Sequence, residues 1–279
     1  MKSEELLIRP IAHIHCDFKE KFGIPRQSGL IDSARAKIVF LPEYRNPDAL
    51  RGLDGYTHLW LLWQFSEAVR SEWSPTVRPP RLGGNKRMGV FASRSPFRPN
   101  PIGLSSVKIV SIDLNTSKGP IIEVAGADLL DGTPIYDIKP YLAYTDSHPD
   151  AASGFALTSD APKLDVEIPE EILEKIPADL HQSIIDILAE DPRPGYQDDP
   201  SRIYTMQYAT HENRAPKTPA QHIPLPVRIR ARNRHPVRPL RQDGANFYFQ
   251  ATAERRRMRT RCHLLSRIPF LSLCKNGSC

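Results

Sequence analysis

The sequence lacks the motifs that mark several common classes of protein. It has no G-x-G-x-x-G stretch between a strand pattern and a helix pattern, and no G-x-x-x-x-G-K-[ST] stretch, which argues against a Rossmann enzyme and a P-loop NTPase. Its four cysteines, Cys16, Cys262, Cys274 and Cys279, form no C-x-x-C pair and have no histidine at zinc-site spacing. We therefore expect reduced thiols, with neither a disulfide framework nor a metal site.

Long apolar runs are absent as well. None approaches the roughly 18 residues that a membrane-spanning helix needs, and the acidic start MKSEELLIRP is unlike a signal peptide, which opens basic and then turns apolar. We therefore expect a cytoplasmic protein without a membrane span. A chain of 279 residues, of which 40% are hydrophobic, is long enough to bury a substantial core.

Positive charge is concentrated at one end of the chain. Residues 214–279 hold 15 Lys and Arg against two acids, whereas residues 1–213 hold 23 bases and 30 acids. The positive net charge of the chain, +6, therefore comes from residues 214–279. It does not indicate what the mildly acidic body, residues 1–213, binds.

Short β patterns fill the first half of the sequence. Each is rich in β-branched or aromatic residues and is bounded by Pro, Gly, Asn or Asp, and they lie at residues 4–15, 36–41, 56–65, 87–93, 104–114 and 121–130. Helical periodicity appears only late, at residues 169–176 and 178–194, before a last strand pattern at 202–208. The spacing predicts a mainly β fold, either a small closed β-barrel or a strongly curved sheet, followed by a late helical segment and a short C-terminal α+β region.

The pattern changes from Arg214 onward. Seven prolines and clustered arginines accompany apolar residues that follow neither a two-residue nor a 3.6-residue period. We expect an irregular basic tail that does not add to the core. The predicted organisation is a barrel domain over residues 1–150, a helical and strand subdomain over residues 151–213, and this tail over residues 214–279.

One stretch of the body is unusually basic and rigid. Residues 78–103 contain six cationic side chains, five prolines, four glycines and no acid. Prolines fix φ and glycines permit positive φ, so the stretch predicts two stiff turns on either side of a short strand. Arginines fixed on such turns favour a bound anion or polyanion, because guanidinium donors pair with phosphate and carboxylate. The alternative is a solvated basic loop that pairs with acids of the body.

Two further stretches combine turn residues with side chains suited to a small ligand. Pro25, Arg26 and Gln27 precede Gly29 on a turn, which also fits an ordinary surface turn. In residues 126–151, two aspartates surround an apolar pair before the turn DGTP, and a further carboxylate, a lysine and two tyrosines follow in extended chain. Carboxylates there can hold amino or hydroxyl groups, or they can cap the turn and form a surface ion pair.

The tryptophan-rich stretch at residues 56–65 has a simpler interpretation. His58 has apolar neighbours and fits a packed strand residue better than a catalyst. Trp60 and Trp63 are most simply core side chains.

Five stretches of this chain, several of them long, have unusual compositions. They read EKFGIPRQSGL, RGLDGYTHLWLLWQF, PTVRPPRLGGNKRMGVFASRSPFRPNPIGLS, LLDGTPIYDIKPYLAYTDSHPDA and DPRPGYQ. Together they closely resemble the YaeB-like (TsaA, TrmO) family of tRNA methyltransferases, from about Leu7 to about Tyr208. The resemblance implies an enzyme that depends on S-adenosylmethionine and methylates N6 of N6-threonylcarbamoyladenosine at position 37, beside the anticodon of threonine tRNAs. It also implies a β-barrel and a homodimer with the cofactor near the subunit interface.

The resemblance carries a set of cofactor-binding residues onto this sequence, motif by motif. They are Pro25, Arg26, Gln27, His58, Leu59, Arg94, Leu104, Asp128, Leu129, Leu130, Asp131, Gly132, Thr133 and Pro134. Backbone groups at the glycine and proline turns can read the edge of an adenine, and carboxylates can hold a ribose or an ammonium group.

The basic stretch then has a functional interpretation. We expect a basic rim that receives the anticodon loop of tRNA and the carboxylate of the threonylcarbamoyl group; its members are Arg78, Arg81, Lys86, Arg87, Arg94 and Arg98. Phosphate contacts of this kind orient RNA and make its affinity depend on salt. For removal of the N6 proton, or for orienting the amide, the candidates are Asp137, Lys139 and Tyr141.

Alternatives remain open at this point. The chain could be a non-catalytic RNA-binding module that uses the same rim, or a methyltransferase of the same build that acts on another substrate. The tail departs from the family, in which another apolar strand is expected after RIYTMQY. It is either a basic extension that helps to hold tRNA or the product of an out-of-frame end, and its unpatterned Arg, Pro and Cys content favours the second.

Overall fold

The computed structural model describes residues 6–79, 82, 84–156, 163–193 and 203–209, together with the backbone of residues 226–230 and 247–250. The strands are β1 (Ala12–Cys16), β2 (Arg35–Phe40), β3 (His58–Gln64), β4 (Thr76–Val77), β5 (Met88–Gly89), β6 (Ile102–Thr116), β7 (Gly119–Ala125), β8 (Pro134–Pro140), β9 (Asp165–Glu167), β10 (Ile203–Met206), β11 (Pro226–Arg230) and β12 (Phe247–Gln250). The α-helices are α1 (Ala143–Asp146), α2 (Glu170–Leu173) and α3 (Ala178–Ala189). Among the described residues no helix is both long and apolar enough to cross a bilayer.

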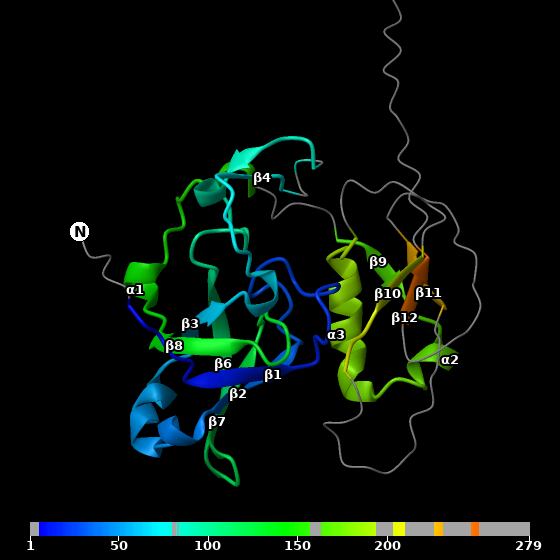
Figure 1. The fold of residues 1–279 in the computed structure, drawn as a ribbon. Coiled ribbons are helices and arrows are strands. Elements are labelled where there is room, and N and C mark those ends of the chain that lie inside the picture. The colour runs from blue at the N-terminus through cyan, green and yellow to red at the C-terminus, as the bar shows by residue number, and fades with distance from the viewer. Residues whose placement is uncertain are drawn as a thin grey trace, which may run out of the picture.

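Six strands close into a barrel in the order β1-β2-β7-β6-β3-β8, which is the left half of Figure 1. Every neighbouring pair is antiparallel. Successive side chains of a strand point to opposite faces, and β3 shows this most regularly. In β3 the inward set is Leu59, Leu61 and Trp63, all buried. The prediction of a mainly β closed barrel is confirmed.

The expected strands differ from the observed ones in several places, and the first of them begins only at Ala12. Residues 87–93 form only the two-residue β5 and a 3₁₀ turn over Val90–Ala92, because prolines next to the paired strand β4 lack the N–H that would extend the ladder. The strand expected over residues 121–130 ends at Ala125, where Gly126 turns the chain with φ of +77°. Gly126 is also tightly packed, since a Cβ there would lie 3.2 Å from the backbone of Gly29.

The segment that contains α3 packs on one end of the barrel, to the right in Figure 1. Helix α3 buries Leu180, Ile184, Ile187 and Leu188 on one face, as its sequence period predicts, and these residues share one core with the barrel. Ser33 donates a hydrogen bond to Asp186 of α3.

A second sheet of four strands has the order β10-β12-β11-β9. Strand β10 was expected from the sequence, but β11 and β12 fall in the stretch after residue 214 that was expected to be irregular. Their backbones pair with β9, with β10 and with each other. The rest of residues 214–279 lies outside the described residues, so the expectation of an irregular tail stays a prediction. Because the apolar residues of β11 and β12 follow no long period, the sequence pattern gave no sign of these two strands.

Candidate functional site

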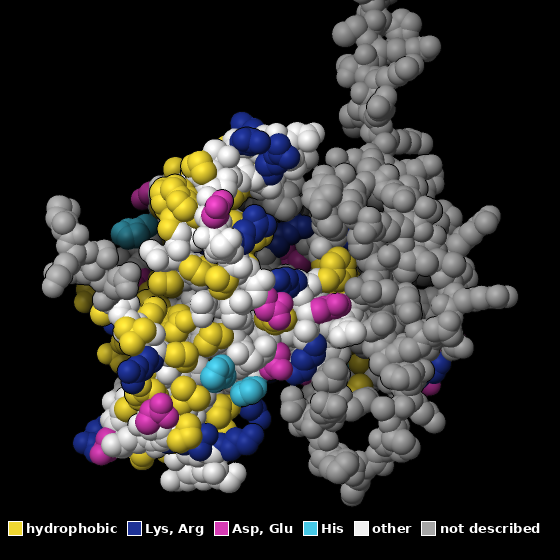
Figure 2. Space-filling model, in the orientation of Figure 1, with side chains coloured by type: hydrophobic (Ala, Val, Ile, Leu, Met, Phe, Trp, Pro, Cys, Tyr) yellow, Lys and Arg dark blue, Asp and Glu magenta, His cyan; other side chains and the backbone are white. Residues whose placement is uncertain are grey.

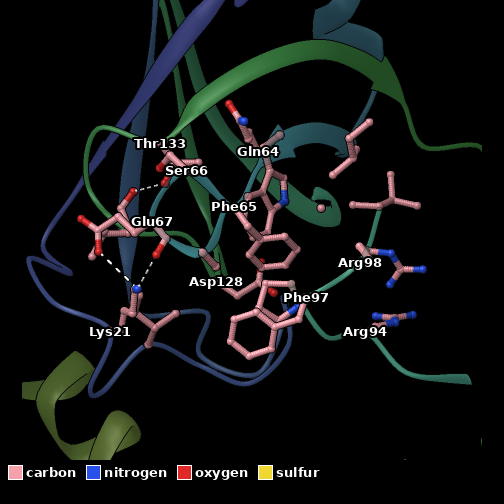
Figure 3. A pocket seen from close by; sticks show the side chains of 18 of the residues that line it. Lys21, Gln64, Phe65, Ser66, Glu67, Arg94, Phe97, Arg98, Asp128 and Thr133 are labelled. Carbon is pink, nitrogen blue, oxygen red and sulfur yellow. Dashed lines mark hydrogen bonds and ion pairs between the residues drawn. The ribbon is translucent and has the colours of Figure 1, made fainter. Parts of the chain in front are cut away.

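A cavity of about 1160 Å³ lies where loops gather at the ends of β3 and β6, and Figure 3 shows it from close by. Its walls come from the loop at residues 21–27, from β3 and the chain that follows it, from residues 94–104, and from the loop at residues 128–133. Arg94 and Arg98 lie on one side, Lys21 and Glu67 on the other, and Asp128 between them. The cavity therefore presents both signs of charge to a ligand.

Asp128 is held by two hydrogen bonds in series. The indole Nε1 of Trp63 donates to Oγ of Ser105 at 2.9 Å, and Ser105 Oγ donates to Oδ1 of Asp128 at 2.5 Å. Since an indole N–H can only donate, the Ser105 hydroxyl must accept there and is free to give its own proton to the carboxylate. Ser105 and Trp63 are both buried, so this relay fixes the position of Asp128 on the cavity wall.

Asp128 has a cation near it, Arg94, but forms no ion pair with it. Burial raises the pKa of Asp128, and the hydrogen bond from Ser105 and the charge of Arg94 offset only part of that rise. Within the described residues Asp128 forms no ion pair, because Arg94 donates to the side-chain oxygen of Gln27 instead. A half-buried carboxylate that has no ion-pair partner among the described residues favours a ligand that brings positive charge or hydroxyl donors.

Aromatic and cationic groups form the other side of the cavity. The Arg70 guanidinium lies 3.6 Å from the centre of the Phe97 ring, and Phe65 packs against Trp63 with ring centres 4.3 Å apart. Arg98 donates to the carbonyl of Ser93 at 3.1 Å. The flat faces suit a planar ring of a ligand, and the free guanidinium donors suit a carboxylate.

Residues that follow α3 and β10 support the loop that carries Pro25, Arg26 and Gln27. Arg26 donates to the carbonyl oxygens of Asp191 and Arg193 at 3.0 and 3.2 Å. Near the start of the same loop, the ring of Phe18 meets that of Tyr208 edge to face, with centres 5.3 Å apart. One wall of the cavity is thus held in place from outside the barrel.

The structure brings many of the predicted cofactor-binding residues together and leaves others apart. Those that line the cavity are Pro25, Arg26, Gln27, Arg94, Leu104, Asp128, Leu130 and Thr133. Those outside its lining are His58, Leu59, Leu129, Asp131, Gly132 and Pro134. Leu59 and Leu129 are buried in the core, and His58 is bonded to the hydroxyl of Thr57.

Asp131 faces away from the cavity toward the end of β1. It pairs with Lys19 at 2.6 Å and accepts the backbone N–H of Cys16 at 2.9 Å. Burial alone would raise the pKa of Asp131, but the bonds from Lys19 and Cys16 outweigh it, and the pKa is lowered. The neighbouring Cys16 thiol is free, and burial raises its pKa to about 12.

We expect Asp131→Asn to lower the free energy of unfolding by about 1 kcal/mol at pH 7, since it removes a partly exposed charged pair. Because the pKa of Asp131 is lower in the folded state, the ionised carboxylate stabilises the fold at pH values above its unfolded pKa of about 3.9. This stabilisation is lost as the pH falls through the folded pKa. The difference between variant and wild type should therefore become smaller as the pH falls below about 3.9. Urea unfolding at pH 7 and pH 3 measures this; an equal difference at both values would contradict it.

The three candidates for proton removal lie on or just after β8, outside the cavity lining. Asp137 and Lys139 form an exposed ion pair at 3.0 Å. The ring of Tyr141 packs on that of Trp60, with centres 5.4 Å apart, and Trp60 itself lines the cavity. Their assignment to the chemistry stays a prediction.

The predicted basic rim divides in the same way. Arg94 and Arg98 line the cavity. Arg78, Lys86 and Arg87 do not line it and are exposed next to the paired strands β4 and β5. Arg81 lies outside the described residues. Figure 2 shows Lys and Arg side chains gathered on this face around β4 and below it.

Sequence reasoning missed two kinds of site residue. Trp63 is a core residue as predicted and Trp60 is half-buried, but their second role, as lining of the cavity, was not predicted. Ser105 was not predicted either, because its place beside Trp63 depends on the register of β3 and β6.

A closed barrel whose end loops enclose a charged and aromatic cavity defines a barrel protein that binds a small polar ligand. The model of the tRNA-methyltransferase O N-terminal domain matches residues 13–147, and that of the TrmO C-terminal domain matches residues 161–213. The chain belongs to the tRNA-methyltransferase O family.

Relatives and a solved structure agree with this assignment. The tRNA (adenine(37)-N6)-methyltransferase of Escherichia coli K12 is 45% identical over 193 residues, which is 67% of this chain and 82% of that protein. A protein of the same name from Eikenella corrodens is 49% identical over 152 residues, 54% of this chain and 85% of that one. The crystal structure of TrmO from Pseudomonas aeruginosa superposes with a TM-score of 0.56 at 34% identity, covering 73% of this chain and 89% of that chain.

Proposed function

We propose that this chain transfers a methyl group from S-adenosylmethionine to N6 of N6-threonylcarbamoyladenosine at position 37 of threonine tRNA. At the coarser level it is a tRNA (adenine(37)-N6)-methyltransferase that uses S-adenosylmethionine, as its family membership and its relatives indicate. The observation that carries the proposal is the cavity with the relay-held Asp128 on one wall and two arginines on another.

The residues of this cavity fit the cofactor. S-adenosylmethionine carries an adenine ring, a ribose diol, an ammonium, a carboxylate and a sulfonium whose methyl it supplies to a nucleophile. Asp128 suits the cationic or hydroxyl groups, Arg94 and Arg98 suit the carboxylate, and Phe65 and Phe97 offer faces for the ring. In such a site positioning contributes most to the rate, because the acceptor nitrogen must lie in line with the methyl.

A cytoplasmic homodimer is part of the same proposal. Ile102 and Leu104 on β6 line the cavity and are 42% and 54% exposed, so this edge of the site is apolar and open to a second subunit. Sedimentation of the purified chain tests the oligomeric state.

Methyl transfer to three RNAs tests the activity. We expect transfer from labelled S-adenosylmethionine to threonine tRNA that carries the threonylcarbamoyl group, and none to the same tRNA without it or to a tRNA with guanosine at position 37. Calorimetry with the cofactor alone accompanies the assay, since an RNA-binding module has no reason to bind it. Uptake of the cofactor with equal transfer to both forms of threonine tRNA would overturn the proposed substrate but not the enzyme class.

A further inference from the structure

Two large aromatic side chains are exposed together at the base of the β4–β5 hairpin. Trp73 is 51% exposed and Phe91 is 72% exposed, and their rings stack with centres 6.0 Å apart and planes 30° from parallel. The hairpin holds them together, since β4 pairs with β5 and the N–H of Val90 donates to the carbonyl of Pro75 at 2.9 Å. Trp73 and Phe91, here called the aromatic pair, form a fixed apolar surface in contact with solvent.

The segment around the aromatic pair is strongly positive. Residues 69–98 contain seven Lys and Arg and one acid, Glu72, within a body whose overall balance is acidic. Six of these cations are described, and none is in an ion pair with a carboxylate of the described residues; they are Arg70, Arg78, Lys86, Arg87, Arg94 and Arg98. Unneutralised cations around an aromatic surface favour a partner that combines negative charge with flat rings, which describes single-stranded RNA.

Both members of the aromatic pair are close in sequence to residues that line the cavity. Arg70, which lines the cavity, precedes Trp73 by three residues, and Arg94, which also lines it, follows Phe91 by three residues. The guanidinium of Arg70 stacks on Phe97 of the cavity wall. Three residues span at most about 10 Å, so the neighbours of a nucleotide bound at this wall of the cavity come within reach of Trp73 and Phe91.

We propose that the aromatic pair is a stacking platform for an unpaired base of the tRNA loop, next to the nucleotide that is methylated. The proposal rests on the proposed function. A base that enters the cavity must leave its stack, and its neighbour then loses a stacking partner. Stacking on an aromatic side chain is worth about 1–3 kcal/mol per base, so the platform offsets part of that loss.

Substitution of Trp73 tests the platform. We expect Trp73→Ala to weaken binding of full-length threonine tRNA by about 5- to 150-fold, the equivalent of that stacking energy, while Trp73→Phe keeps most of the affinity. Binding is measured by filter retention without cofactor, at several salt concentrations. Because stacking releases no counter-ions, the slope of log affinity against log salt should stay as in wild type, whereas Arg87→Gln should reduce that slope.

Tyr44→Ala is the matched control. Tyr44 is 37% exposed on a short helix in the first part of the chain, and the segment that carries it lies at the other end of the barrel from β4 in Figure 1. This variant should bind tRNA like wild type. Affinity for S-adenosylmethionine, measured by calorimetry, should be unchanged in all these variants.

Two results would overturn the platform. One is wild-type tRNA affinity in Trp73→Ala. The other is a change of sedimentation in Trp73→Ala that accounts for its weaker binding, which would make the aromatic pair an interface between two copies of the chain. Failure of the proposed function appears differently, as absence of cofactor uptake and methyl transfer in the wild-type protein.

Discussion

Asp128→Asn is expected to weaken the binding of S-adenosylmethionine by about 30-fold or more. The substitution keeps the shape of the side chain and removes its charge. Loss of one partner from a buried, hydrogen-bonded charge pair costs about 2–5 kcal/mol, and Asp128 is the acid of the cavity that the Trp63–Ser105 relay holds in place. Calorimetry of the full chain at pH 8 measures the effect. Asp54→Asn, on an exposed turn near Leu53, is the matched control and should bind the cofactor normally.

The pH dependence of cofactor binding provides an independent check. The pKa of Asp128 is raised by burial, so the carboxylate that attracts a cation is fully present only above that value. Affinity of the wild type should fall as pH drops through the raised pKa, and Asp128→Asn should lack this dependence. The charged group that faces Asp128 is Arg94, which stays protonated throughout. Identical pH profiles for the two proteins would refute the role given to Asp128.

A neutral analogue separates the groups that Asp128 can contact. S-adenosylhomocysteine has the same ribose and ammonium but no charge on sulfur. If Asp128 stabilises the sulfonium, Asp128→Asn should lose more affinity for S-adenosylmethionine than for this analogue. If Asp128→Asn loses the same affinity for both ligands, the carboxylate contacts the ammonium or the ribose.

The barrel could be predicted from the sequence because its strands carry local signals. In β3, strict alternation puts Leu59, Leu61 and Trp63 inside, and Pro or Gly residues end most of the other strands. The short 3₁₀ helices between residues 42 and 55 could not be predicted, because three- and four-residue turns show no apolar period. The irregularity between β3 and β8 at Leu62 and Trp63 also depends on pairing with a distant strand.

The site was predictable only where one motif contains it. Pro25, Arg26 and Gln27 are adjacent in sequence and reach the cavity together. Asp128 and Asp131 illustrate the limit, because they are the same residue type on one loop, yet one faces the cavity and the other pairs with Lys19. The relay needs the register of β3 and β6, which places Leu61 opposite Ser105, and no local pattern determines that register.

Gly103→Ala is expected to lower the free energy of unfolding by about 2–3 kcal/mol, within the range for overpacking a core. Gly103 pairs with Trp63 across β3 and β6, and a Cβ at this position would lie 2.3 Å from the indole ring. The ring cannot easily move, because it packs against Phe65 and donates to Ser105. Any shift of Trp63 also loosens the relay to Asp128, so affinity for S-adenosylmethionine should fall together with stability.

Gly89→Ala is the control for Gly103→Ala. Gly89 has φ of −58°, and a Cβ there meets nothing within 4 Å, so this variant should differ from wild type by less than about 0.5 kcal/mol in urea unfolding. Combining Gly103→Ala with Trp63→Phe removes part of the clashing ring and should recover stability, but not cofactor affinity, because phenylalanine has no N–H for Ser105. Recovery of both stability and affinity would show that the indole fills space without orienting Asp128. If Gly103→Ala is as stable as Gly89→Ala, the close contact between residue 103 and the Trp63 ring is contradicted.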